Sequence, residues 1–201
     1  MGMIPKYFLE KLYLNDKRSV AQIAKQLNCS QGRIDYWLDV HEIKKRSISD
    51  AQYINHNPQG DPFLLTDRKD VETAFLQGLG LGLYWGEGNK KNTHAVRLGN
   101  TDPRLIRTFL AYLKEIWNID EKKLRFGLQI FSDMNPESAL NFWAKELGVP
   151  KSTFQKVIVT KSGKVGTYRE KTKHGVVTLY FHNKKLRDLI CDAIEKIEIL
   201  G

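Results

Sequence analysis

The sequence contains little cysteine and no long apolar segment. Only Cys29 and Cys191 occur among 201 residues, and neither belongs to a Cys-x-x-Cys pair or lies near a pair of histidines. This spacing favours two free or buried thiols over a disulfide framework or a structural zinc site. The longest uninterrupted stretch of apolar residues and glycines lies within residues 78–86. That stretch is far shorter than the roughly 20 residues that a membrane-spanning helix needs.

A secretory signal is also missing from the N-terminal segment MGMIPKYFLEKLYL, which has no continuous apolar stretch followed by small residues. We therefore expect a cytoplasmic protein with no membrane partner. Apolar residues make up 41% of the chain and charged residues 27%, a balance that excludes a disordered protein. A chain of this length predicts one or two globular domains.

Acidic residues are the minority among the charged ones, and the imbalance is local. The chain has 32 Lys and Arg against 23 Asp and Glu, which gives a formal net charge of +9. The whole excess lies in residues 145–187, where 11 basic side chains accompany 2 acidic ones. A segment with this charge favours a negatively charged partner: nucleic acid, an anionic membrane surface or an acidic protein.

Proline is scarce, and two of the six prolines lie in one turn-forming cluster, NHNPQGDP. Because Pro58, Gly60 and Pro62 cannot continue a helix, the cluster predicts a domain boundary near residues 57–66. We expect a small helical domain with its linker over residues 1–60 and a second domain over residues 67–201.

The first domain has the sequence signals of two short helices joined by a tight turn. Ser19 and Gln22 form a capping box that predicts a helix from Val20, Asn28 suits a left-handed turn, and Ser30 caps the next helix. The apolar positions expected to face inward are Val20, Ile23, Ala24 and Leu27 in the first helix and Ile34, Trp37 and Leu38 in the second. This arrangement resembles a helix-turn-helix, and the alternative is an ordinary helical hairpin.

The outward face of the second helix carries side chains that suit DNA. The expected DNA-binding residues are Ser30, Gln31, Arg33 and Tyr36. Asp35 and Asp39 repel phosphates, which favours a helix that reads a few bases over one that binds the backbone. The basic triplet at residues 44–46 is interpreted as a solvated or phosphate-contacting helix end, and Ser49 is expected to cap a short helix after it.

Residues 71–88, VETAFLQGLGLGLYWGEG, predict a buried helix because they stay apolar until Glu87. Gly78, Gly82 and Gly86 recur every four residues and share one face of that helix. Each interior glycine destabilises a helix by roughly 1 kcal/mol relative to alanine, so a close-packed second backbone is expected to offset the loss. That second helix belongs either to another part of the chain or to a second copy.

Two other interpretations of this segment remain open. Gly78, Gly80 and Gly82 spell a nucleotide-loop pattern, but the preceding residues do not form the strand that such a loop requires. Glu87 is either a surface carboxylate at a helix end or one of two carboxylates that meet across a symmetric helix pair. In the second case a hard cation such as Mg²⁺ would relieve their repulsion.

Residues 80–88, GLGLYWGEG, resemble the LAGLIDADG motif of homing endonucleases. The match keeps the central glycine-leucine pair, the small residue, the acidic residue and the terminal glycine. Tyr84 and Trp85 depart from the motif, and Glu87 replaces the commoner aspartate. The resemblance implies a homodimer, because the family needs two acidic residues to place metals at two scissile phosphates.

The order of the following segments is similar to that of the LAGLIDADG fold over about residues 71–200. Period-two alternation and capping residues predict strands over residues 93–100, 123–131, 154–160 and 176–181, with helices over residues 102–117, 136–147 and 184–200. The fold class expected is α+β, with a mixed sheet covered by helices on one face. The helix at residues 136–147 is an addition to the family pattern.

The resemblance also implies a site. Base-reading side chains on the outward face of a saddle-shaped sheet would be Arg97, Arg125 and Gln129. The implied catalytic residues are Glu87, which would bind magnesium, with Asn100 and Lys156. A basic arm would follow the DNA backbone with Lys161, Lys164, Arg169, Lys171 and Lys173, and the alternative for this arm is a solvated hairpin loop.

Three functions compete. The first is a magnesium-dependent, site-specific DNA endonuclease with Glu87 as the metal ligand. The second is a transcriptional regulator that keeps the fold and the helix-turn-helix without chemistry; some bacterial regulators combine such domains in the reverse order. The third is an RNA- or membrane-surface-binding protein, which would leave the helix-turn-helix and the glycine stripe unexplained. Double-stranded DNA is the partner that the first two share.

Overall fold

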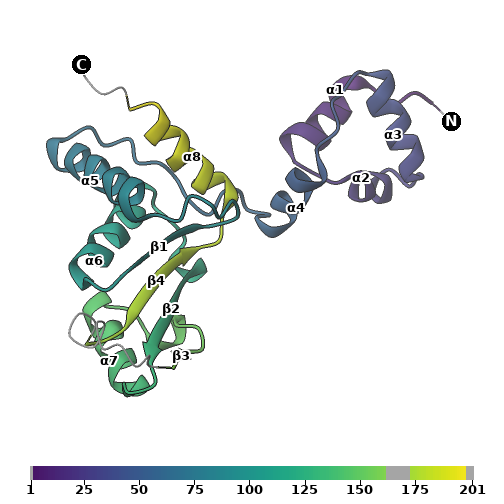
Figure 1. Ribbon diagram of the computed structural model, residues 1–201. Helices are drawn as coiled ribbons and strands as arrows, with labels where there is room; N and C mark the ends of the chain where they lie inside the picture. Colours follow the sequence, from purple (N-terminus) through teal and green to yellow (C-terminus); the bar gives the residue numbers. More distant parts are fainter. Residues whose placement is uncertain (1, 162–172, 198–201) are drawn as a thin grey trace. The chain divides into compact units, whose positions relative to one another are not determined.

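The computed structural model describes residues 2–161 and 173–197, and the chain divides into two compact units, Met1–Asp61 and Pro62–Gly201 (Figure 1). The division falls inside the turn cluster at residues 55–62. Residues 62–66 belong to the second unit, because the Leu64 and Thr66 amides donate to the carbonyls of Trp117 and Ile116, both at 2.8 Å. No described helix is long and apolar enough to cross a membrane.

The first unit is helical. Its elements are α1 (Lys6–Leu9), which continues as the π-helix η1 (Glu10–Asn15), then α2 (Val20–Gln26), α3 (Gln31–Val40) and α4 (Ile48–His56). One cluster of buried side chains joins them: Ile4, Leu9, Leu12, Tyr13, Ile23, Ala24, Ile34, Leu38 and Ile43. The expected inward residues Val20, Leu27 and Trp37 pack against this cluster while staying partly exposed.

The local signals for α2 and α3 are confirmed. Ser19 and Gln22 make the reciprocal capping box, Asn28 has a φ of 48°, and the Ser30 hydroxyl accepts from the Arg33 amide at 3.3 Å. The expected cap of α4 is wrong by two residues. Ser47, not Ser49, precedes the helix, and its Oγ accepts from the Asp50 amide at 3.1 Å. Its hydroxyl also donates to the Asp50 carboxylate at 2.7 Å, which fixes the start at Ile48.

The second unit contains a mixed sheet and the remaining described helices, which confirms the α+β class. The strands are β1 (Val96–Asn100), β2 (Leu124–Phe131), β3 (Ile158–Thr160) and β4 (Val176–Phe181). The helices are α5 (Val71–Glu87), α6 (Pro103–Ala111) with its π-helical continuation η2 (Tyr112–Ile116), η3 (Glu121–Lys123), α7 (Pro136–Leu147), η4 (Lys151–Thr153) and α8 (Lys184–Glu195).

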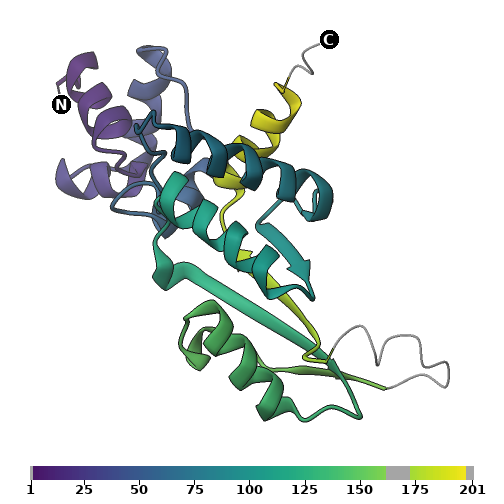
Figure 2. The ribbon, with the colours of Figure 1, turned by 90° about the vertical axis from the view of Figure 1, so that its left-hand side faces the viewer.

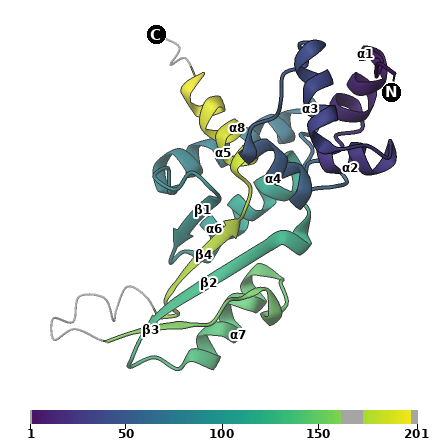
Figure 3. The same ribbon diagram turned by 90° about the vertical axis from the view of Figure 1, so that its right-hand side faces the viewer.

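The described strands lie in the order β1-β4-β2-β3 (Figure 3). β4 is antiparallel to both β1 and β2, whereas β3 runs parallel to β2. Because β2 lies between β3 and β4, the two strands that flank the basic arm do not pair. β3 and β4 therefore do not form a two-stranded hairpin, and most of the arm, residues 162–172, lies outside the described residues. The strand expected over residues 154–160 is only three residues long, with Phe154 joined to Phe126 by an isolated bridge.

One face of the sheet is covered by helices (Figure 2). Burial alternates along β2 and β4, as the sequence pattern predicted. The buried strand residues form one core with side chains of α5, α6, α7 and α8, including Tyr84, Phe109, Trp143 and Ile190. The opposite face of β1, β4 and β2 carries side chains outside this core.

The expectation that α5 is a buried helix is wrong. Only Gly80, Leu81 and Tyr84 are buried along it. Gly80 packs against Tyr112, since a Cβ at Gly80 would lie 2.1 Å from the Tyr112 Cγ. Leu76 and Leu83 are partly buried against the same core, and the opposite side of the helix presents apolar side chains and glycines to solvent.

Candidate nucleic-acid interface

The sheet face opposite the helices carries polar, basic and glycine residues in aligned rows. The β1-β4-β2 register gives a first row of Arg97, Tyr180 and Arg125, a second of Gly99, Thr178 and Gly127, and a third that pairs Val176 with Gln129. None of these side chains is acidic. The expected base-reading residues Arg97, Arg125 and Gln129 thus share this face, which we call the open face.

Tyr180 lies at the centre of the first row, among three neighbours. The Arg97 guanidinium carbon is 5.1 Å from the centre of its ring. The His182 ring lies parallel to it, with an interplanar angle of 3° and 5.9 Å between ring centres. A Cβ on Gly127 would be 2.9 Å from the Tyr180 Cε2, so the ring occupies the space that a side chain on β2 would need.

His182 is uncharged at neutral pH in this setting. Burial lowers the pKa of its imidazole, and the positive charges of Arg97 and Arg125 lower that pKa further. A neutral imidazole offers one hydrogen-bond donor and one acceptor. It therefore sits beside Tyr180 without adding a third positive charge.

The second row has glycine at both outer positions and Thr178 between them. A Cβ on Gly99 would lie 2.8 Å from the Thr178 Oγ1, so a side chain there would require the Thr178 hydroxyl to move. Thr178 supplies the one hydroxyl of this row. Thr178, Tyr180 and His182 were missed from the sequence, although the alternation in VVTLYF already placed Thr178 and Tyr180 on the outward side.

Two of the three expected base readers are bonded within the chain. Arg125 Nη1 donates to the carbonyls of Lys122 at 2.7 Å and Leu124 at 2.6 Å. Gln129 Nε2 donates to the Thr160 hydroxyl at 3.1 Å. Arg97 makes no such bond with the described residues, and its Nε is buried without a partner.

The expected catalytic residues lie at two different edges of the sheet within one chain. Glu87 is the exposed last residue of α5, and the following Gly88 forms a bridge to Leu98, which places Glu87 beside the edge strand β1. The Asn100 side-chain oxygen accepts from the amides of Thr101 at 2.7 Å and Asp102 at 3.0 Å, so it shapes the turn into α6. Lys156 is exposed just before β3, at the other edge of the sheet.

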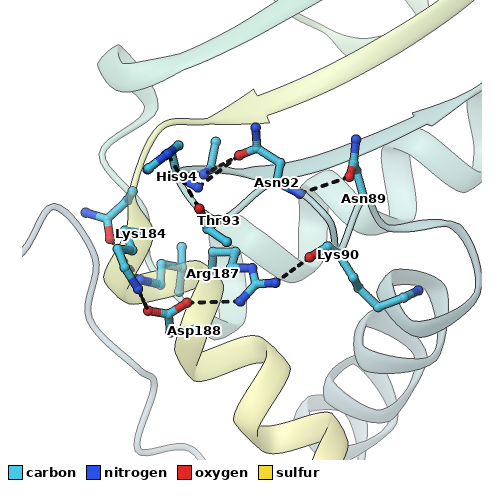
Figure 4. A network of polar contacts seen from close by, with 11 residues as sticks. Asn89, Lys90, Asn92, Thr93, His94, Lys184, Arg187 and Asp188 are labelled. Atoms are coloured by element: carbon cyan, nitrogen blue, oxygen red, sulfur yellow. Dashed lines mark hydrogen bonds and ion pairs between the residues drawn. The ribbon is translucent and has the colours of Figure 1, made fainter.

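A network of polar contacts fixes the segment that follows Glu87 (Figure 4). Arg187 on α8 donates to the Lys90 carbonyl at 2.5 Å and to Asp188 at 3.1 Å. The Asn92 side-chain oxygen accepts from the His94 amide at 3.0 Å. Gly88 is required here because a Cβ would lie 2.4 Å from the Tyr84 carbonyl oxygen. The end of α5 is therefore rigidly joined to β1 and α8.

The carboxylate in this network is ionised. Burial raises the pKa of Asp188, but hydrogen bonds from Lys184 and Arg187 outweigh that effect and leave the pKa below its usual value. Asp188 thus balances the two cations that lie nearest the segment at residues 89–94. The network supports the fold around Glu87 without placing another acidic group beside it.

The expected dimer-interface glycines form an open surface. A Cβ added to Gly78, Gly82 or Gly86 would meet no atom within 4 Å. Large apolar side chains near these glycines are exposed as well: Val71 by 85%, Phe75 by 71% and Trp85 by 49%. No described segment of the second unit covers this surface, which we call the glycine face of α5.

In the first unit, the expected DNA-contacting residues have different surroundings. Ser30 is occupied as the cap of α3, and Arg33 donates to the Gly2 carbonyl at 2.5 Å. Gln31 is exposed, and Tyr36 is 60% exposed with its ring edge-on to Trp37. Gln31 and Tyr36 are the two that keep their side chains available.

Lys44 and Lys45 of the basic triplet at residues 44–46 are exposed, and Lys45 and Arg46 also have partners within the first unit. Lys45 Nζ lies 3.4 Å from Asp35 and 3.0 Å from Asp39, so it offsets one of the two negative charges that these residues give α3. The Arg46 guanidinium stacks on Tyr13 with 4.0 Å to the ring centre and donates to the carbonyls of Lys17 and Arg18. These contacts connect the end of α3 to η1.

The basic arm begins and ends at the Gln129 end of the open face. The Ser132 amide donates to the Thr160 carbonyl at 2.9 Å, and Trp143 Nε1 donates to the His174 carbonyl at 2.7 Å. Lys161 and Lys173 are exposed beside these two anchors. The other expected arm residues, Lys164, Arg169 and Lys171, lie outside the described residues.

Comparisons of the chain with protein-family models, with curated proteins and with solved structures gave no match.

Proposed function

We propose that this chain is a sequence-specific double-stranded-DNA-binding protein whose open face lies in the major groove. The observation that carries the proposal is a helix-free sheet face without acidic side chains, on which Arg97, Thr178 and Tyr180 project from neighbouring strands. Two strand spacings of about 4.8 Å make β1, β4 and β2 together about 10 Å wide. The major groove is about 12 Å wide and presents a distinct hydrogen-bonding pattern for each base pair.

A homodimer is part of the proposal. The glycine face of α5 exposes apolar side chains and closely spaced glycines, which a second copy of the same helix would cover. The pairing would bring two copies of Glu87 near each other, because Glu87 is the last residue of that helix. It would also present two open faces to one duplex.

We propose that DNA cleavage, if the protein is an endonuclease, requires Glu87, because residues 80–88 resemble the LAGLIDADG motif. The described residues of one chain do not fit a complete magnesium site. They contain no group of three or more acidic, histidine or cysteine side chains, and the Asn100 side-chain oxygen is already used twice. A hard cation needs about six oxygen ligands, so oxygens from the second copy and from DNA phosphates would have to complete the set.

A regulator without cleavage activity is the second candidate. It is favoured by the capped helices α2 and α3, which we propose act as a helix-turn-helix, with Gln31 and Tyr36 exposed on α3. In this version the first unit adds selectivity, and Glu87 is a surface carboxylate at the helix end.

The test compares Glu87→Gln with Glu72→Gln, which neutralises another exposed carboxylate at the other end of α5. Both variants and the wild type are incubated with a randomised duplex library, first for binding and then with Mg²⁺ for cleavage. We expect duplex binding by all three, and cleavage reduced about 100-fold or more in Glu87→Gln alone. If the wild type binds duplex DNA but cleaves none of it with each divalent metal tested, the protein is a regulator and not an endonuclease.

The binding half of the experiment also tests the choice of partner. Duplex DNA is compared with duplex RNA of the same sequence, whose major groove is too deep and narrow for side chains to read. We expect selective retention of DNA. Equal or tighter binding to RNA, or to anionic vesicles with no retention of DNA, would contradict the proposed function.

A further inference from the structure

The two arginines of the open face, Arg97 and Arg125, differ in their hydrogen bonding with the described residues. Arg125 is bonded to two backbone carbonyls, whereas the Arg97 guanidinium makes no hydrogen bond or ion pair with the described residues. The Arg97 Nε is buried. The terminal amino groups are therefore the donors that remain for a ligand.

Tyr180 restricts where that guanidinium can lie. The Tyr180 ring lies over Gly127 of β2 and beside His182, the residue that follows β4. The Arg97 guanidinium of β1 lies over the same ring. A stacked guanidinium loses less conformational freedom on binding than a free one, because its rotamer is already chosen. The ring therefore acts as a platform for the arginine.

We propose that Arg97 recognises a guanine in the bound duplex and that Tyr180 is the positioning residue that makes this recognition specific; the inference rests on the proposed function. The planar guanidinium fork matches the O6 and N7 acceptors of guanine in the major groove. Gly127 leaves room on β2 for the Tyr180 ring, and Gly99 adds no side chain to β1 two residues beyond Arg97. His182 contributes its neutral ring to the same stack.

A phosphate contact is the alternative role for Arg97, and it has a different signature. An arginine bound to a phosphate strengthens binding to every duplex and adds about 0.9 to the magnitude of the slope of log K against log salt. An arginine bound to guanine changes the preference at one base pair instead. The two roles therefore separate in a measurement of affinity against sequence and salt.

The experiment uses the full chain and a duplex selected from a randomised library. Each base pair of the selected duplex is changed in turn, and affinities are measured by fluorescence anisotropy at several salt concentrations. For the wild type we expect one G·C pair whose replacement weakens binding about 5- to 150-fold. In Arg97→Gln this discrimination disappears at that pair and persists at the others.

The tyrosine variants test the positioning role. Tyr180→Phe keeps the ring and should retain the discrimination, whereas Tyr180→Leu should lose most of it at the same base pair with an unchanged salt slope. Arg104→Gln removes an equal charge from α6, on the helix side of the sheet, and should change no preference. Thermal unfolding of each variant shows that the fold is intact before affinities are compared.

Three results would overturn the inference. Uniform weakening by Arg97→Gln, with a salt slope smaller by about 0.9, would make Arg97 a phosphate contact. Unchanged discrimination in Tyr180→Leu would remove the positioning role. A wild type that binds duplex DNA with no preferred G·C pair would contradict the inference alone, whereas a wild type that binds no duplex would contradict the proposed function as well.

Discussion

Neighbouring glycines of α5 have opposite surroundings. At Gly80 the closest atoms belong to the Tyr112 ring, and a methyl group there would overlap with it. At Gly78, two residues earlier, the same methyl group would meet nothing within 4 Å. The first glycine is needed for packing, while the second contributes only backbone flexibility within this chain.

We therefore expect Gly80→Ala and Gly78→Ala to change stability in opposite directions. Gly80→Ala should lower the free energy of unfolding by about 1–3 kcal/mol, because the buried Tyr112 must move. Gly78→Ala should raise the free energy of unfolding of the single chain by up to about 1 kcal/mol, because alanine is the better helix former and its methyl group meets no atom of the same chain. Urea unfolding followed by circular dichroism measures both, and equal destabilisation would contradict the packing difference.

Local signals were the part of the sequence that could be interpreted reliably at the level of single residues. Ser19, Asn28 and Ser30 act within three residues of their own positions, so their roles as caps and turns could be predicted. The partners of long side chains could not. Lys45 reaches back to α3 and Gln129 reaches across to β3, and both contacts depend on how distant segments meet.

Among the elements, α5 has the most unusual surface. A helix that is apolar all round is typical of a buried core helix, which is why the sequence favoured that interpretation. An interface helix has the same composition, because its second side is covered only in the assembly. The exposed Val71 and Phe75 are therefore consistent with a helix that packs inward on one side and pairs on the other.

The expected homodimer makes a prediction about the glycine face. Gly82→Leu places a large side chain where the chain itself has free space, so the monomer should fold, but two helices could no longer approach closely. We expect the wild type to sediment as a dimer and Gly82→Leu as a monomer in analytical ultracentrifugation. Gln77→Leu, which adds the same side chain on another exposed side of α5, should remain dimeric.

The dimer would be contradicted if the wild type sedimented as a monomer across the micromolar range. It would also be contradicted if Gly82→Leu kept the mass of the wild type, since the glycines would then have no role in pairing.

Strand positions followed from the sequence, but their order in the sheet did not. Alternation located β2 within one residue and β4 at its observed bounds. The placement of β3 and β4 on opposite sides of β2 depends on non-local pairing, and no local signal distinguishes it from a pairing of β3 with β4. For the same reason the sequence placed Lys156 in a catalytic group with Glu87, whereas the strand order puts them at opposite edges of the sheet.

In the whole molecule, the net positive charge and the exposed uncharged side chains that could contact DNA lie in different segments. Residues 145–187 hold the entire net charge of +9. In the first unit, Lys45 and Arg46 are used internally, which leaves α3 with the uncharged Gln31 and Tyr36 as its exposed candidates. The proposed division is that the second unit supplies the electrostatic affinity and reads bases with its open face, while the first unit adds further selectivity.

This division predicts how salt affects the variants. Lys161→Gln and Lys173→Gln remove exposed charges at the two anchors of the basic arm, and each should reduce the magnitude of the slope of log K against log salt by about 0.9. The double variant should reduce it by about 1.8, because separate phosphate contacts release counterions independently.

Lys6→Gln, an equal change of an exposed lysine in the first unit, should leave the slope unchanged. Anisotropy titrations on one duplex at several salt concentrations measure these slopes. An equal loss for all three single variants would mean that the backbone contacts are spread over both units, because the slope counts phosphate contacts wherever they occur.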